Sequence, residues 1–567
     1  MTAGTPANGA ALETPEDPRR WITLAIVIIS AFIVVLDNTV LNVAIPTILR
    51  EFHTTLPSLE WVVTGYALTF ATFLIIGGRL GDVYGHRRVF VIGAALFGVG
   101  SLLASISHSV GMMIIGEAII EGLGASLMLP ATLAILSTTF HGRERATAFA
   151  AWGATAGVAA ASGPVVGGFL TNFYSWRWAF RINVAIAPLA ILGAMLFMQR
   201  GERAARRVKI DVPGAVLIAV GMFSLVFALS EGGIYGWLTP TKDFTIAGHV
   251  VWPTTRAISI IPLFFAVAVV ALLAFTLVER AKERNNSSPL FEFAYLRFKT
   301  YRYGLLTGVV IAMGQLGISF VLPVFLQDGR HISPWHNGLW VLPSGLFIIV
   351  GAQLGGRLIN RFGTIQVVRS GLVIYEIGLL LMLHSISLHL TALELLPGLA
   401  LYGLGVGFAL AQLTNVVLSE IPPEGSGVAS GANTTVRQVG SALGVAVIGT
   451  VLTVQTVSYA VQYIKASSLS AARKAQAIAG IHARGSGYTA PQTAGHATAD
   501  VIRVALEQGV VHGTRVALVF AFVVVGIGTF ISLLIPNTAP IPADERHHGA
   551  NGFEPLEPLD PDPALLH

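Results

Sequence analysis

Apolar runs of about twenty residues recur between residues 21 and 535, and this repetition constrains the fold more than any other feature of the chain. Only 11% of the 567 residues are charged, and the mean hydropathy is +0.71. An ordinary soluble domain has roughly 25% charged residues. A helix needs about twenty apolar residues to cross a bilayer and satisfies its own backbone there. The sequence therefore predicts an all-α polytopic membrane protein.

The net charge of +5 comes mainly from short loops beside the predicted spans. Because Lys and Arg concentrate in cytoplasmic loops, this charge indicates topology, and we expect no nucleic acid as a partner. The chain has no cysteine, which excludes disulfides, thiolate metal sites and Cys nucleophiles. Its first twenty residues are polar and lack an apolar core, so we expect no cleavable signal peptide.

The distribution of basic residues predicts about fourteen spans with both termini in the cytoplasm. Arg19 and Arg20 precede the first span, and basic loops follow the sixth and eighth spans. We expect these parts: a disordered cytoplasmic N-terminus (1–20), a six-helix bundle (21–198), two linker helices with basic loops (199–302), a second six-helix bundle (303–535) containing an extracytoplasmic polar loop (459–512), and a disordered cytoplasmic tail (536–567). An amphipathic stretch near 500–508 indicates a short surface helix in that polar loop.

The segment G-R-L-G-D-V-Y-G-H-R-R, residues 78–88, joins the second and third spans. Arg87 and Arg88 place this loop in the cytoplasm and so fix the direction of the spans around it. Asp82 is positioned to cap the next helix or to pair with an arginine, and Gly85 supplies backbone freedom.

Three of the acidic residues inside predicted spans are candidates for a proton or cation site: Asp37 in the first span, and Glu117 and Glu121 in the fourth. A carboxylate in hydrocarbon is costly and usually serves a pathway for ions, protons or substrate. Glu117 and Glu121 share a helix face and repel each other, so at least one is expected to hold its proton near neutral pH. Asp37 and Glu117 both fall in the outer half of the bilayer, where they can face one cavity. The alternative is that all three bond neighbouring helices for structural reasons.

Other polar residues within spans are candidates for lining a substrate cavity, although packing against a neighbouring helix is the alternative for each. They are Asn42, Tyr66, Gln315, Glu376 and Arg437. The fifth span is rich in small residues, which let another helix approach closely, and it contains a proline that favours a kink. A hinge and simple tight packing are both consistent with its residues Gly157, Gly163, Pro164, Gly167 and Gly168.

The chain repeats itself. Residues 77–85 read G-G-R-L-G-D-V-Y-G and residues 355–363 read G-G-R-L-I-N-R-F-G, so Gly356 corresponds to Gly78. The same offset (356 minus 78) carries Asp37 onto Gln315. Duplication of this kind is typical of transporters built from repeated bundles, with the substrate site between the halves near the midplane.

With these motifs in place, residues 21–535 resemble the fourteen-helix drug:proton antiporters of the major facilitator superfamily, the EmrB/QacA type. The resemblance implies that the loop 78–88 helps to control alternating access and that Asp37 handles cations or protons. It also implies that the fifth-span glycines and Pro164 form the motif that marks exporters. The chain departs from the family in the fourth helix, where Glu117 and Glu121 replace the usual Arg and Gln. The usual role of that Arg therefore does not carry over, and the reversed charge favours cationic compounds.

These observations predict a secondary transporter: a proton-coupled antiporter that exports amphipathic, cationic drugs or small molecules across the plasma membrane. Its expected partners are the substrate, protons and the lipid bilayer; we expect a monomer without cofactor or metal. The alternative is an exporter of a lipid, a lipid-linked precursor or a specific endogenous metabolite. An enzyme is not expected, because His86, His108 and Asp37 fall at different depths and no H-E-x-x-H or G-x-S-x-G is present.

Overall fold

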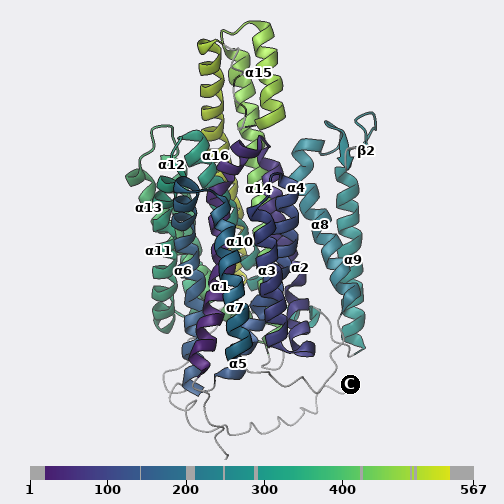
Figure 1. The fold of residues 1–567 in the computed structure, drawn as a ribbon, viewed down its shortest axis with the longest axis vertical. Helices are drawn as coiled ribbons and strands as arrows, with labels where there is room; N and C mark the ends of the chain where they lie inside the picture. Colours follow the sequence, from purple (N-terminus) through teal and green to yellow (C-terminus); the bar gives the residue numbers. More distant parts are fainter. Residues whose placement is uncertain are drawn as a thin grey trace, which may run out of the picture.

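The computed structural model describes residues 19–140, 142–198, 211–246, 249–285, 291–421, 426–485, 488, 490 and 495–536. The predicted disordered ends lie almost entirely outside these residues, as does the basic loop that follows the sixth predicted span. Within the described residues the protein is an elongated set of long helices, most of which run roughly parallel to its longest axis (Figure 1).

The N-terminal bundle is formed by the helices up to residue 197. They are α1 (Arg20–Phe52), α2 (Leu56–Tyr84), α3 (His86–Ser105), α4 (Val110–Met113), the π-helix η1 (Ile114–Glu121), α5 (Gly122–Thr139), α6 (Gly142–Phe173) and α7 (Arg177–Phe197). The elements α4, η1 and α5 form one continuous span. Helix α3 packs between α5 and α7, and α1 packs along α6.

A helical hairpin follows, made of α8 (Val212–Tyr235) and α9 (Ile261–Arg284). Its tip carries the antiparallel strands β1 (Phe244–Ile246) and β2 (His249–Trp252). Helix α8 contacts α2 and α14, so the hairpin lies against the side of the two bundles.

A charged cluster joins the two helices of this hairpin at their open end. The Asp211 side chain caps α8 by accepting the Gly214 N–H at 2.9 Å, and it pairs with Lys282 near the end of α9. Lys282 also pairs with Glu279 at 3.1 Å. Burial acts to raise the pKa of Asp211, but hydrogen bonds from Glu279, Lys282 and the Gly214 N–H outweigh it and hold that pKa below its usual range.

The C-terminal bundle contains the remaining helices. They are the 3-10 helix η2 (Phe293–Arg297), α10 (Lys299–Val324), the π-helix η3 (Phe325–Gly329), α11 (Pro334–Phe362), α12 (Thr364–Ser385), α13 (Ala392–Leu418), α14 (Ser426–Ala466), α15 (Ala471–Arg484) and α16 (His496–Leu533). Helix α13 packs on α11 and α12, while α14 packs on α10 and α16.

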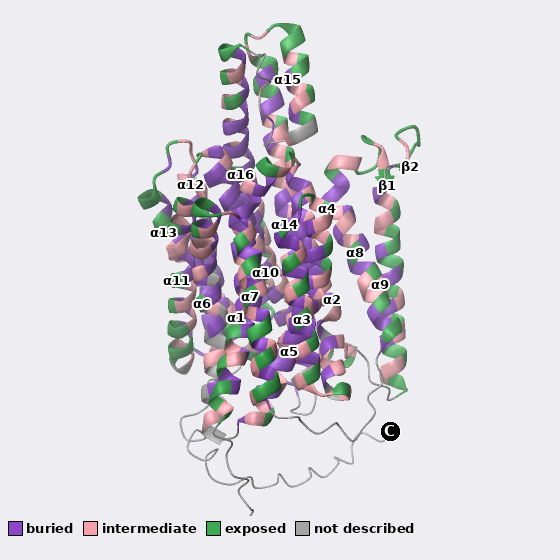
Figure 2. Cartoon of the chain, viewed as in Figure 1, coloured by how far each residue is buried: buried purple, intermediate pink, exposed green. Residues whose placement is uncertain are grey.

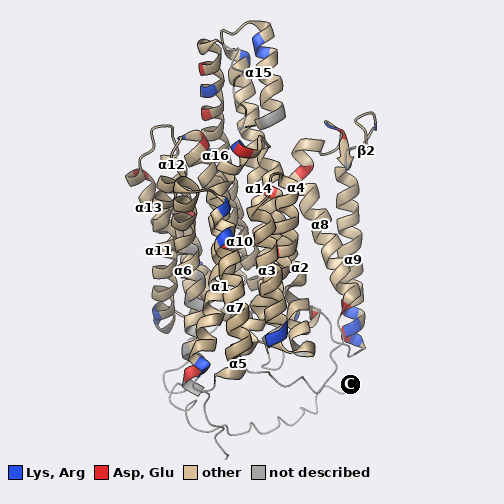
Figure 3. Ribbon diagram, in the orientation of Figure 1, with Lys and Arg blue, Asp and Glu red and all other residues tan. Residues whose placement is uncertain are grey.

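Twelve spans among the described residues are long and apolar enough to cross a membrane. Helices α2 and α6, with 29 and 32 residues, are not among these twelve, although they occupy the second and fifth predicted spans. The structure confirms an all-α polytopic fold, and the number fourteen stays a prediction. Buried residues fill the middle of the bundles, and acidic and basic residues are sparse along the middle of most helices (Figures 2 and 3).

The internal repeat is visible in the helix boundaries. Helix α11 begins and ends 278 positions after α2, which is the offset of the repeated motif (356 minus 78). Each of these helices ends at a glycine with positive φ, 93° at Gly85 and 81° at Gly363. Residues with side chains rarely adopt this conformation, which explains a glycine at both positions.

Residues 459–512 are not the long polar loop expected from the sequence. Helix α14 continues to Ala466, α15 follows, and α16 begins at His496, so the amphipathic stretch near 500–508 is part of α16. These segments enclose a core of their own that includes Ile464, Ile481 and Ile502. They extend beyond the bundles at one end of the molecule (Figure 1). We call this part the projection, and the end of the bundles that carries it the projection end.

The two bundles meet at the projection end. Arg50 of α1 pairs with Asp328 of η3 at 2.9 Å, and the Gln327 side-chain amide donates to the Val43 carbonyl at 2.8 Å. Glu60 of α2 contacts α14 in the same region. These contacts close the interface between the bundles at that end.

Candidate functional site

Asp37, Glu117 and Glu121 meet inside the N-terminal bundle. One carboxylate oxygen from each lies within 4.8 Å of the other two. Asp37 is 3% exposed, and both glutamates are fully buried. The structure therefore brings together the three acids that the sequence singled out, and we call them the acid cluster.

A fourth residue, Asn183 of α7, links two members of the acid cluster. Its side-chain amide donates to Asp37 Oδ1 at 2.7 Å and to Glu121 Oε1 at 3.1 Å. Asn183 is 1% exposed, so water does not compete for these bonds. Nothing in the sequence singles out Asn183, because a single Asn in an apolar helix carries no spacing signal by itself.

Local backbone structure brings the glutamates close to this amide. Glu117 and Glu121 both lie in the π-helix η1, a wider turn that is rare and often occurs at functional sites. Gly100 of α3 faces Glu121: a Cβ at this glycine would lie 2.7 Å from the Glu121 Cβ. The missing side chain therefore lets α3 approach η1 closely.

The acid cluster has more acceptor atoms than donors. Within the described residues, both Glu117 oxygens, Asp37 Oδ2 and Glu121 Oε2 have no hydrogen-bond partner. Three ionised carboxylates at this spacing would repel strongly in a dry environment. The arrangement can therefore share protons among its oxygens, and the oxygens are also close enough to hold a cation.

The remaining polar candidates are dispersed. Glu376 of α12 accepts the hydroxyl of Thr529 from α16, so it bonds a neighbouring helix. The backbone carbonyl of Gln315 accepts the Tyr402 hydroxyl at 3.3 Å. Neither residue belongs to the acid cluster.

Three further candidates lie on α1, α2 and α14. Asn42 is 2% exposed, and its amide has no partner among the described residues. Tyr66 is buried and stacks on Phe70 with ring centroids 6.2 Å apart. Arg437 faces Gly308 of α10, where an added Cβ would lie 3.6 Å from the arginine Cγ.

The loop between α2 and α3 is compact. Gly85 ends α2, and Arg87 donates to the Met195 carbonyl at the end of α7. Arg88 is exposed, and Gly78 lies beside Pro130 of α5, with 3.7 Å between an added Cβ and the proline Cβ. The side chain of Asp82 lies outside the part that the structure describes.

The small residues of α6 pack this helix against both bundles. A Cβ at Gly163 would overlap Thr39 of α1, and one at Gly167 would lie 2.9 Å from the Val40 carbonyl. On the other side, Gly168 and Pro164 approach α11, and Gly157 lies near Ile349. The expected close packing is present, with the glycines at the contacts between α6 and its two partners.

Two bundles related by an internal repeat, joined at one end and carrying buried acids, define a membrane transporter of the repeated-bundle class. The chain belongs to the Major Facilitator Superfamily, whose profile matches residues 27–240 and 211–445. It is therefore a secondary transporter for small molecules, and not an enzyme.

Known relatives cover most of the chain. A probable actinorhodin transporter of Streptomyces coelicolor is 35% identical over 455 residues, which are 79% of this chain and 75% of the relative. The puromycin resistance protein pur8 of Streptomyces alboniger is 30% identical over 562 residues, 98% of each chain. The multidrug resistance protein Stp of Mycobacterium tuberculosis is 30% identical over 434 residues, 76% of this chain and 75% of Stp.

Solved structures share the fold. A bacterial homologue of the human lysosomal transporter Spinster, in an inward-facing and occupied conformation, superimposes with a TM-score of 0.61. The match covers 93% of this chain and all of that one, at 15% identity.

Proposed function

We propose that this protein exports amphipathic, cationic drugs in exchange for protons, and that the acid cluster binds the coupling protons. The observation that carries the proposal is the burial of three neighbouring carboxylates, two of which share one amide donor. Protons are the smallest species that can neutralise such a cluster without opening the bundle. The names of the relatives, which include resistance to puromycin and to multiple drugs, support drugs as the substrate class.

The proposed orientation places the projection outside the cell. Arg20 at the start of α1 and the end of α16, near Ile535, lie at the opposite end of the bundles, together with Arg87 and Lys282. Basic residues at helix ends favour the cytoplasm, and an even number of crossings leaves both termini there. The closed projection end then corresponds to a carrier that is shut toward the outside.

The proposed cycle follows from the charge of the cluster. Protons that enter from outside neutralise the carboxylates, the substrate leaves outward, and the reoriented carrier releases the protons to the cytoplasm. A negative cluster also raises the local concentration of cations, which favours cationic substrates. Interactions with such substrates are expected to be loose and largely apolar.

Transport of ethidium in reconstituted vesicles tests the proposal. Wild type should accumulate ethidium against its gradient when a pH gradient is imposed, whereas Asp37→Asn and Glu117→Gln should lose accumulation but keep downhill exchange. Glu376→Gln is the matched control, because this acid bonds Thr529 away from the cluster. A sodium gradient that drove transport in the absence of a pH gradient would contradict proton coupling. Failure of the wild type to move any lipophilic cation would contradict the substrate class.

A further inference from the structure

Glu60, near the start of α2, is a buried acid that the acid cluster does not include. Its side chain is 0% exposed, and neither carboxylate oxygen has a hydrogen-bond partner among the described residues. The carboxylate lies directly against the backbone of α14: a Cβ at Gly449 would be 2.6 Å from Glu60 Oε1. Glu60 therefore lies within the contact that joins the two bundles at the projection end.

The groups around Glu60 do not compensate a negative charge. Helix α14 contributes Gly449 to this environment. Helix α10 contributes Phe320, whose ring edge is 3.2 Å from the position that a Cβ at Gly449 would occupy. Helix α8 presents Glu231, the charged group that acts on Glu60 electrostatically. Glu231 is itself engaged, because it accepts the indole N–H of Trp61 at 2.6 Å.

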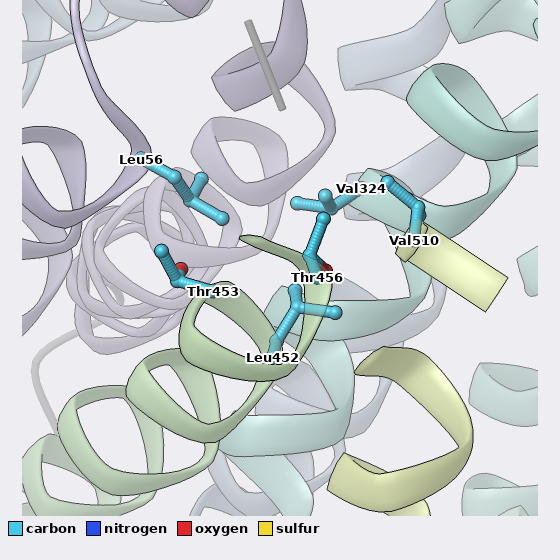
Figure 4. A pocket seen from close by; sticks show the side chains of 6 residues that line it. All are labelled: Leu56, Val324, Leu452, Thr453, Thr456 and Val510. Carbon is cyan, nitrogen blue, oxygen red and sulfur yellow. The ribbon is translucent and has the colours of Figure 1, made fainter. Parts of the chain in front are cut away.

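A small cavity lies one helical turn from Glu60, toward the projection. Its volume is about 10 Å³, which is about the space that one water molecule needs, and it is lined by Leu56, Val324, Leu452, Thr453, Thr456 and Val510 (Figure 4). The hydroxyls of the two threonines have no partner among the described residues. This space and the two unpaired hydroxyls suit a single ordered water on the projection side of Glu60.

Burial of an unpaired carboxylate costs far more than burial of the neutral acid. The contact between α2 and α14 therefore accommodates Glu60 when the side chain carries a proton and opposes closure when it does not. We infer that Glu60 is a proton-operated latch of the projection end: it takes a proton from the outer water while α2 and α14 are apart, and this neutralisation permits them to close.

The latch differs from a coupling site in its proton balance. The carboxylate gains one proton from the projection side on closing and returns it to the same side on opening, so no proton crosses the membrane through Glu60. The inference rests on the proposed alternating cycle for its direction. It predicts that Glu60→Gln alters the opening of the projection end and leaves the proton-to-drug ratio unchanged.

Distance measurements between spin labels test the latch directly. The chain has no natural cysteine, so Thr54→Cys near the start of α2 and Ser458→Cys on α14 give one specific pair. In lipid nanodiscs, the wild-type background should shift toward longer distances as the pH rises from about 5 to about 9, because Glu60 ionises. Glu60→Gln should stay at the short distance throughout, and Glu60→Asp should keep the shift.

Two further variants identify which acid causes the pH-dependent change in distance. Glu231→Gln removes the neighbouring acid and should keep a pH-dependent shift, whereas Asp37→Asn removes a member of the acid cluster and should also keep it. An unchanged shift in Glu60→Gln, or a wild-type distance that does not respond to pH, would overturn the latch. Loss of the shift in Asp37→Asn alone would assign gate control to the acid cluster, which would overturn the latch while leaving proton-coupled export intact.

Discussion

Asn183→Leu removes the amide that donates to two carboxylates of the acid cluster while keeping a side chain of similar size. A hydrogen bond to a charged group contributes about 1.5–3 kcal/mol. At about 1.4 kcal/mol per tenfold change in proton affinity, losing one such bond corresponds to about one to two pH units. Because the amide stabilises the ionised acids, its loss should make the cluster hold protons up to a higher pH. The pH of half-maximal transport should therefore rise by that amount.

The assay is ethidium exchange in proteoliposomes with equal pH on both sides, measured from about pH 5 to about pH 9. Asn337→Leu is the matched control, because Asn337 is equally buried but lies on α11, outside the acid cluster. Asn183→Gln retains the amide and should shift the profile less than leucine does. A profile that stays in place or moves to lower pH in Asn183→Leu would refute the reasoning, as would an equal shift in the control.

Three other changes have definite expected results. Gly163→Ala places a Cβ against Thr39, and overpacking of this kind costs about 1–3 kcal/mol of folding free energy. The melting temperature in detergent should therefore fall, and adding Thr39→Ala should restore part of the loss. Asp328→Asn breaks the partly exposed ion pair with Arg50, which is worth about 0.2–1 kcal/mol. The distance between spin labels at positions 54 and 458 should lengthen modestly. Exchanging the charges of residues 50 and 328 should restore the shorter distance. The pKa of Asp211 is lowered in the folded protein, so its ionised carboxylate stabilises the fold above the ordinary aspartate pKa of about 3.9. This stabilisation is lost as the pH falls through the pKa that Asp211 has in the folded protein. Asp211→Asn should therefore have a lower melting temperature than wild type at neutral pH, and the difference should shrink below about pH 4.

Periodic features of the fold could be predicted from the sequence because they depend on long apolar runs and on repetition. The offset between Gly78 and Gly356 locates α11 from α2, and the two positive-φ glycines occur at the same offset. The projection is not predictable in this way, because its apolar residues, such as Ile464 and Ile481, are few and separated by polar ones. Its helices are stabilised by packing on one another, which hydropathy does not register.

Among the buried polar residues, too, some have a clear signal in the sequence and others do not. Asp37 and Glu117 stand out in the sequence because a charge inside an apolar run is rare, and the structure places them together. Asn183 has no such contrast, and Glu60 directly precedes the apolar run that begins at Trp61, a place where an acid is common. The π-helix η1 is equally hard to predict from the sequence, since it lies where α2 and α3 pack against it and such packing leaves no local sequence signal.

Helix α14 connects the closed interface to the tip of the projection as one continuous rod. The stretch from Gly449 to Ala466 spans about 25 Å at 1.5 Å per residue. A tilt of about 10° at the interface would therefore move the tip by roughly 4 Å. Motion inside the bilayer becomes displacement at a water-exposed surface, so an antibody fragment that clamps the tip would arrest the transport cycle without ever entering the membrane.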